Sequence, residues 1–219
     1  MFTQRIVLTP ALGRAAELVE VLSERVRGQQ AQGLRAGLHS PLTGHGRLVV
    51  GIGFETLAGL QAFREKNRQD ATFQAFQAKI APLQAKPATF ELWEVTIAVN
   101  PASPPKYVQR IVTTAAPGQA NALKELLSQR VRENQEKGVT CGLGQQMASD
   151  APRFGMVVLF ASLAEFEARR AQLMADSTGQ QFTKKLAALC STHGEVELSE
   201  VLIPAQLAAL REMAGAATR

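Results

Sequence analysis

Side chains that could bind a metal or act as nucleophiles are few in this chain, and they are scattered. The histidines are His39, His45 and His193, and the cysteines are Cys141 and Cys190. A metal site needs several His, Cys, Asp or Glu side chains at ligand spacing, and no such motif stands in the sequence. We therefore expect no metal and no cofactor. Two isolated cysteines are typical of reduced thiols and predict a cytoplasmic protein.

Two Gly-x-Gly stretches could in principle belong to phosphate-binding loops. They lie at residues 51–53 and 142–144. A phosphate-binding loop follows a strand and opens a helix, whereas both stretches fall inside predicted strands, where glycine marks a bend or a close approach. The Gly-x-Ser-x-Gly elbow of hydrolases does not occur in the sequence. Nucleotide binding and serine hydrolysis are therefore not predicted.

The chain carries a long internal duplication, which must set the frame for any site. Residues 4–38 and 109–143 align without a gap and are identical at 19 of 35 positions. After one inserted residue, 47–97 and 153–203 are identical at 18 of 51 positions. Unrelated segments would agree at roughly one position in fifteen to twenty. The sequence thus predicts two structural repeats of about a hundred residues each, too long for a solenoid.

Each repeat is predicted to fold as β-α-β-β-α-α-β. In repeat one, strands are expected at 4–9, 34–40, 47–54 and 90–99, from runs of β-branched and apolar residues. A helix opens at Gly13, carries Leu18, Val21, Leu22 and Val26 at helical spacing, and ends at Gly33. Two shorter helices follow, with Thr56 and Asp70 as expected N-caps. Helices on one face of an antiparallel sheet make an α+β fold.

The predicted domains follow the duplication. They are a first repeat over 1–99, a proline-rich linker over 100–106, a second repeat over 107–204, and a C-terminal helix or tail over 205–219. Three prolines within residues 100–105 exclude a continuing strand or helix there. The terminal helix has no counterpart between the repeats, so it could dock onto another subunit of an assembly.

The composition of the 219-residue chain is that of a globular protein. Hydrophobic residues make up 46% and charged residues 20%, and no apolar run approaches the length of a membrane span. The net charge is +5, but basic residues are scattered among acidic ones and aromatic residues are only 5%. Specific nucleic-acid binding would need a basic stripe with stacking aromatics. We therefore expect no specific nucleic-acid partner and no membrane span.

The order of elements, duplicated in one chain, resembles the dimeric α/β-barrel superfamily. Among its subfamilies the sequence is most similar to the NIPSNAP-like proteins, and the antibiotic-biosynthesis monooxygenase-like families share the architecture. The motifs that carry the NIPSNAP resemblance are Tyr107-Val108-Gln109-Arg110, Pro117-Gly118 and Ser162-Leu163-Ala164-Glu165-Phe166, followed by Asp176 and Phe182. Repeat one departs from them with Phe2 and Leu12 in place of Tyr107 and Pro117. The resemblance implies two fused ferredoxin-like repeats that form an intramolecular barrel.

The resemblance also implies a site. Related monooxygenases carry out cofactor-free oxygen chemistry on aromatic compounds in a pocket between sheet and helices. The corresponding candidates here are Gln4, Arg5, His39 and Trp93, with Arg110 as the copy of Arg5. Repeat two has Gly144 and Ser199 where repeat one has His39 and Trp93. Haem is not expected, since none of the three histidines lies on a predicted helix.

Two functions therefore stand open. The first is a NIPSNAP-like α/β-barrel protein that binds a small apolar ligand or a protein partner, with a homo-oligomer left open. The alternative is a cofactor-independent monooxygenase-like enzyme acting on a small aromatic substrate. Convergence of Arg5, His39 and Trp93 in one cavity would favour the enzyme. Arg25 and Arg130, at the edge of the apolar helix stripe, are expected to lay their stems on the protein with the guanidinium in water. The alternative is a pair with Glu91 or Glu94, or with their counterparts Glu197 and Glu200 in repeat two.

Overall fold

The chain forms two compact units. The computed structural model describes residues 1–42, 46–192 and 194–205. Unit 1 contains Met1–Glu94 and the described residues from Glu200 onward, and unit 2 is Val95–Ser199. The predicted C-terminal helix lies outside the described residues apart from Ala205. The domain limits drawn from the repeat, 1–99 and 107–204 with a linker between them, stay a prediction.

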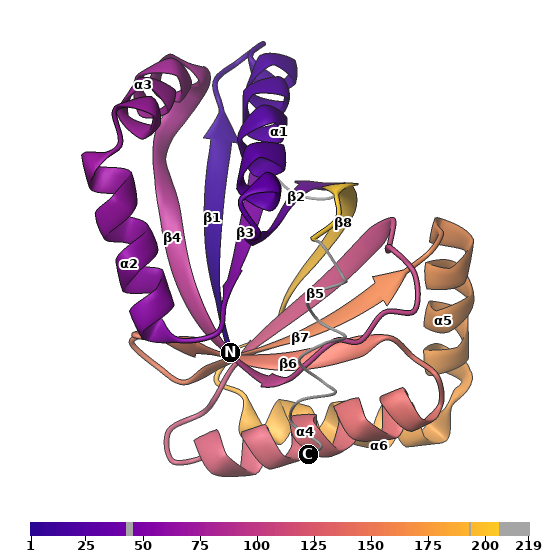
Figure 1. The fold of residues 1–219 in the computed structure, drawn as a ribbon. Coiled ribbons are helices and arrows are strands. Elements are labelled where there is room, and N and C mark those ends of the chain that lie inside the picture. The colour runs from indigo at the N-terminus through magenta and orange to yellow at the C-terminus, as the bar shows by residue number, and fades with distance from the viewer. Residues whose placement is uncertain (43–45, 193, 206–219) are drawn as a thin grey trace. The chain divides into compact units, whose positions relative to one another are not determined.

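Both repeats contain the predicted elements in the predicted order (Figure 1). Repeat one forms β1 (Phe2–Pro10), α1 (Ala15–Ala31), β2 (Arg35–Pro41), β3 (Leu48–Phe54), α2 (Leu57–Gln69), α3 (Ala71–Ile80), the 3-10 turn η1 (Ala81–Leu83) and β4 (Gln84–Ile97). Repeat two forms β5 (Tyr107–Thr114), α4 (Ala120–Glu136), β6 (Cys141–Met147), β7 (Arg153–Phe160), α5 (Leu163–Ala175), α6 (Ser177–Leu189) and β8 (Glu195–Ile203). Hydrogen bonds join the strands in the order of a closed antiparallel barrel, β1-β3-β2-β8-β5-β7-β6-β4. The predicted α+β fold class is confirmed.

In unit 1, β1 lies between β3 and β4 and sets the register of the sheet. Arg5 stands opposite Gly51 on β3 and opposite Glu91 on β4. Because side chains alternate along a strand, Gln4 and Ile6 point to one face of the sheet, while Arg5 and Val7 point to the other. This alternation decides which candidate residues can share a site.

The three helices of unit 1 lie together on the same face of the sheet as Gln4 and Ile6 (Figure 1). Helix α1 buries the apolar stripe that its spacing predicts: Leu18, Val21, Leu22 and Val26. These side chains pack against Leu38, Val50 and Ile52 from the sheet. Burying one such side chain contributes roughly 1.5–3 kcal/mol, so this layer anchors α1. Helices α2 and α3 bury fewer residues, Leu60 and Ile80 among them.

Helix ends follow the expected capping chemistry. The Thr56 hydroxyl accepts from the Gly59 N–H at 3.1 Å, and Asp70 Oδ1 accepts from the Thr72 N–H at 2.8 Å. Hydrogen bonds from the Thr72 hydroxyl and N–H lower the pKa of the Asp70 carboxyl. Ser162 and Asp176 cap α5 and α6 in the same way. Each cap fixes where its helix begins.

Two elements of repeat one differ from their predicted bounds. Helix α1 begins at Ala15 rather than at Gly13, because Gly13 has a positive φ of 74° and belongs to the preceding turn. Strand β4 begins at Gln84 rather than at Phe90. Its additional residues pair with the end of β1, where Gln84 lies opposite Pro10 after two register shifts. The strand is long because β1 continues to offer it a hydrogen-bonding edge.

Unit 2 has its own core. Leu123, Leu127 and Val131 of α4 pack against Leu143, Phe154 and Val158 of the sheet. Of the described helices in the chain, none is long and apolar enough to cross a membrane.

Candidate functional site

A pocket of about 470 Å³ lies within unit 1, between the sheet and its helices. Strand β1 contributes Gln4, Ile6 and Leu8, and helix α1 contributes Leu22, Arg25 and Gln29. Strands β3 and β4 and helices α2 and α3 complete the lining. A volume of this size falls in the range of roughly 300–1,000 Å³ that small-molecule sites occupy.

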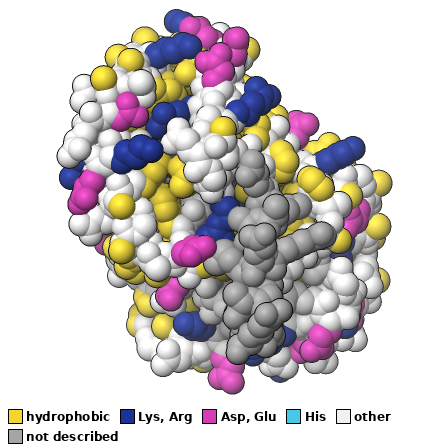
Figure 2. Space-filling view, viewed as in Figure 1, with side chains coloured by type: hydrophobic (Ala, Val, Ile, Leu, Met, Phe, Trp, Pro, Cys, Tyr) yellow, Lys and Arg dark blue, Asp and Glu magenta, His cyan; other side chains and the backbone are white. Residues whose placement is uncertain are grey.

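The pocket wall is largely apolar and aromatic. Four phenylalanines line it: Phe63, Phe73, Phe76 and Phe90. Phe73 and Phe76 of α3 lie 6.1 Å apart between ring centroids, and Phe90 is 62% exposed although it is a large apolar side chain. Figure 2 shows hydrophobic side chains with Lys and Arg among them over this part of unit 1. Such a wall favours a ligand with an apolar body.

Arg25 brings a positive charge to this apolar wall. Its Nη2 donates to Asn67 Oδ1 at 3.2 Å, and its guanidinium carbon lies 5.2 and 5.4 Å from the ring centroids of Phe73 and Phe76. Both distances are in the range of cation–π contacts. The alternative pairing with Glu91 does not occur, because Glu91 belongs to the opposite face of the sheet. Arg25 is instead held by α2 and α3 at the edge of the pocket.

Three buried polar atoms on the pocket wall have no hydrogen-bond partner among the described residues. They are Arg25 Nε, Gln29 Oε1 and Gln84 Oε1. Leaving a buried polar group unpaired costs about 1–3 kcal/mol, so native proteins seldom keep several together. All three belong to residues that line the pocket, although each atom is itself covered by neighbouring side chains.

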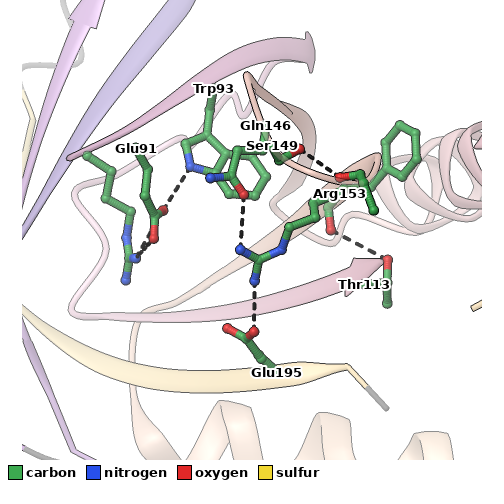
Figure 3. Close-up of polar contacts among 10 residues, drawn as sticks. Glu91, Trp93, Thr113, Gln146, Ser149, Arg153 and Glu195 are labelled. Carbon is green, nitrogen blue, oxygen red and sulfur yellow. Dashed lines mark hydrogen bonds and ion pairs between the residues drawn. The ribbon is translucent and has the colours of Figure 1, made fainter. Parts of the chain in front are cut away.

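The sequence-predicted residues Arg5 and Trp93 lie on the other face of the same sheet, as Figure 3 shows for Trp93 and its partner Glu91. Arg5 Nη1 lies 3.3 Å from both oxygens of Glu91, and Trp93 Nε1 donates to Glu91 Oε2 at 2.9 Å. Arg5 is 9% exposed and Trp93 is 6% exposed. Glu91 therefore joins two of the candidates into one hydrogen-bonded cluster within unit 1.

His39 lies on the same sheet face as Arg5, opposite Val49 on β3. It belongs to β2, two strands away from β1, and it is one row further along the sheet than Arg5. Arg110 is the copy of Arg5 in repeat two, and it lies opposite Val157 on β7 in unit 2. Of the candidates on β1, only Gln4 reaches the helix-side pocket. A role for Arg5, His39, Trp93 and Arg110 in binding stays a prediction.

Unit 2 holds a different set of side chains in the equivalent layer. Sequence alignment of the repeats pairs Phe63 with Arg169 and Phe73 with Gly179. Arg169 Nη2 donates to Asn134 Oδ1 at 2.7 Å, and burial together with the charge of Arg130 lowers the pKa of Arg169. Elsewhere in unit 2, Arg153 bonds to Gln146 and Glu195 (Figure 3). The aromatic wall of unit 1 is thus specific to repeat one.

Metal-ligating side chains do not gather within the described part of the chain, where no group of three or more His, Cys, Asp or Glu residues could hold an ion. The pocket residues Arg25, Gln29 and Asn67 escaped the sequence-based choice of site. Helical spacing places Arg25 and Gln29 four residues apart on one face of α1, which is the signal that could have linked them.

No family profile and no curated protein matches the sequence. Among solved structures, a putative monooxygenase from Fusobacterium nucleatum is 10% identical with a TM-score of 0.76, and each chain is covered to 94%. An anthrone oxidase-like protein is 13% identical with a TM-score of 0.66, covering 92% of this chain and 91% of its own. A NIPSNAP domain protein from Burkholderia xenovorans is 20% identical with a TM-score of 0.36, covering 41% of this chain and 91% of its own.

The whole-length similarities show that the chain shares its fold with the first two of these proteins, and that fold is the closed barrel of two repeats that its sequence predicts.

Proposed function

We propose that this protein binds a small, largely apolar molecule in the helix-side pocket of unit 1. The observation that carries the proposal is the cavity of about 470 Å³ with four phenylalanines and a few polar residues on its wall. Apolar walls supply affinity, and a few convergent polar groups fix orientation. A protein partner is the alternative occupant from the sequence, and the concave shape favours the small molecule.

Binding without catalysis is the simpler form of this proposal. The described residues that line the pocket include no His, Asp, Glu, Cys, Ser, Thr or Tyr. General acid–base and nucleophilic catalysis draw on those side chains. The pocket offers orientation and a positive charge rather than a proton-transfer group.

A neutral fluorescent probe tests the pocket. N-phenyl-1-naphthylamine brightens when it enters an apolar site, and we expect it to do so with the native protein. Ala88 is half-buried at the pocket wall, so Ala88→Trp should fill the cavity and weaken probe binding about tenfold or more, a loss of about 1.4 kcal/mol. Ala187→Trp, on the exposed side of α6 in unit 2, should bind the probe as the native protein does. Equal binding by both variants would refute the proposal.

A second candidate is the cofactor-independent monooxygenase-like activity on a small aromatic substrate. It is supported by the aromatic wall and by whole-length neighbours named as a monooxygenase and an anthrone oxidase-like protein. Oxygen uptake with anthrone as the probe substrate tests it. Native protein should consume oxygen faster than Ala88→Trp does, whereas equal rates would exclude this activity on anthrone.

We also propose the cytoplasm as the compartment and retain a homo-oligomer as the state to measure. Both cysteines are free thiols, which fits a reducing environment. Light scattering of the purified full chain would separate a monomer from an oligomer.

A further inference from the structure

Three arginines line the pocket, whereas the described lining residues contain no carboxylate. They are Arg25 from α1 and Arg64 and Arg68 from α2. Arg25 is partly buried, and a charge removed from water needs a partner. We propose that the molecule bound in this pocket is an organic anion, a carboxylate on an apolar body. This inference rests on the proposed function and names the class of its ligand.

The first observation behind the proposal is that Arg25 is already in position before any ligand binds. Asn67 takes the hydrogen of Nη2, and the rings of Phe73 and Phe76 support the guanidinium plane. The Nε of Arg25 is buried and has no acceptor among the described residues. An oxygen of a bound carboxylate would instead accept from another N–H of the same guanidinium, in a charge-assisted hydrogen bond. Because Arg25 is held in place, little conformational entropy is lost on binding.

The second observation is a comparison of the two repeats. Arg130 is the copy of Arg25, and its guanidinium lies over Phe182, the copy of Phe76. Arg130 has a carboxylate partner within its own helix, because its Nη1 lies 3.8 Å from Glu133 Oε2. The residue of repeat one that aligns with Glu133 is Gly28. Repeat one thus keeps the cation and its aromatic support but lacks the carboxylate.

Charges near Arg25 do not replace that carboxylate. Asp70 feels the charge of Arg25, but it caps α3 and accepts from the N–H and hydroxyl of Thr72. Glu24, the neighbour of Arg25 on α1, pairs with Lys79 at 3.6 Å. In the part of the chain that the structure describes, Arg25 makes no ion pair within 4 Å.

Arg64 and Arg68 stand one helical turn apart on α2 with exposed side chains. Both line the pocket, and neither pairs with a carboxylate among the described residues. Exposed cations raise the local concentration of anions and their rate of entry, an effect that salt screens. These two residues act at the mouth, whereas Arg25 acts on the wall.

The amide of Gln29 fits the same ligand. A half-turn of the terminal amide exchanges its oxygen and NH₂ group at little cost in volume. Gln29 can then donate to a carboxylate oxygen, whereas the amide of Gln84 already donates to the Ile80 carbonyl at 3.4 Å. The pocket therefore supplies donors around one charged group and an aromatic wall for the remainder.

The test compares two probes of the same shape and different charge, 2-naphthoate and 2-naphthamide, as competitors of N-phenyl-1-naphthylamine on the full chain. We expect naphthoate to bind about tenfold more tightly, a difference of about 1.4 kcal/mol. Its affinity should fall as salt rises from about 50 to 500 mM, whereas that of naphthamide should stay constant. Equal affinities, or tighter binding of naphthamide, would overturn the proposal.

Substitutions of the arginines test whether they cause the preference for naphthoate over naphthamide. Arg25→Gln should abolish the preference for naphthoate, and the ratio of the two affinities is insensitive to a general loss of stability. If Arg25→Gln does not fold, the double variant Arg64→Gln/Arg68→Gln takes its place, with an expected loss of about threefold or more for naphthoate alone. Arg170→Gln, the exposed copy of Arg64 in unit 2, should change neither affinity.

The outcomes also separate this inference from the function on which it rests. If neither naphthalene compound displaces the neutral probe and the probe itself does not bind, the pocket proposal fails. If both compounds bind equally and Ala88→Trp weakens both, the pocket proposal stands and only the anion is wrong.

Discussion

Arg25 and Arg130 occupy equivalent positions, yet the two repeats satisfy them with different partners. In repeat one, Asn67 on α2 receives the guanidinium of Arg25 from α1. In repeat two the helices exchange roles, and Arg169 on α5 donates to Asn134 on α4. Each repeat therefore keeps one arginine–asparagine bond between its first two helices. In repeat one, an aromatic cavity lies beside the arginine.

Glu91 is the residue on which the opposite sheet face of unit 1 depends. Its carboxylate is shared by Arg5 and by the Trp93 indole, and the Arg5 and Glu91 side chains are 11% and 17% exposed. Removing one partner of a largely buried pair leaves the other charge uncompensated. We expect Glu91→Ala to lower the free energy of unfolding by about 2 kcal/mol or more, measured by urea denaturation with Trp93 fluorescence.

Glu94→Ala is the matched control, since Glu94 is exposed on the same strand. A surface substitution of this kind changes stability by about 0.5 kcal/mol at most. Equal effects of the two substitutions would show that the Arg5–Glu91–Trp93 cluster contributes nothing particular to stability.

The two cysteines should differ in reactivity. Burial raises the pKa of both thiols, and Cys141 is fully buried, with its Sγ donating to the Val131 carbonyl at 3.5 Å. A raised pKa reduces the thiolate fraction at any given pH, and the thiolate is the reactive form. At pH 8 we expect Cys190→Ser protein, which retains Cys141, to react with dithiobis-nitrobenzoate about tenfold more slowly than Cys141→Ser protein. Equal rates in the folded state would mean that Cys141 is accessible.

At the scale of elements, one glycine marks a place where two backbones approach each other inside unit 2. A Cβ at Gly142 on β6 would lie 2.7 Å from the Ile97 carbonyl oxygen, closer than real contacts allow. Gly51 on β3 has no heavy atom within 4 Å of the same position. We expect Gly142→Ala to destabilise the fold by about 1–3 kcal/mol and Gly51→Ala to have little effect, as measured by thermal denaturation. Similar losses for both would point to a general cost in the strand rather than to this contact.

The sequence predicted the helices and strands better than it predicted the candidate site. The stripe of Leu18, Val21, Leu22 and Val26 and the caps Thr56 and Asp70 identified helices because their signals are local. The start of β4 could not be predicted, since residues 84–89 form a strand only through pairing with β1.

The site was predicted less well for a related reason. Gln4 and Arg5 were both assigned to one pocket, although neighbouring strand residues face opposite ways. Arg25 is expected from the sequence to extend into water, whereas its hydrogen-bond partner Asn67 lies 42 positions away on another helix. A cavity forms where many side chains together do not fill the space between the elements, so no single residue in the sequence predicts it.

At the scale of the whole molecule, we expect ligand binding to change hydrogen exchange in unit 1 and not in unit 2. The pocket is lined from β1, β3, β4 and α1–α3 of unit 1, and their counterparts in repeat two carry different side chains. Hydrogen exchange of the full chain with 2-naphthoate should show slower exchange in α2 and α3, where few residues are buried without ligand. Helices α5 and α6 should exchange unchanged. Protection of both helix pairs would contradict a site confined to unit 1.

Trp93 is the chain's only tryptophan, and it lies across the sheet from the pocket of unit 1. The backbone of one sheet layer separates the indole from any molecule seated against β4, because side chains on the two faces of a strand point in opposite directions. A separation of one sheet layer is short enough for resonance energy transfer from the excited indole to a bound naphthyl or larger conjugated compound. The protein thus contains one tryptophan that can donate excitation energy, and the backbone of the sheet keeps it out of contact with the ligand. A ligand would reveal itself by sensitised emission without touching the tryptophan.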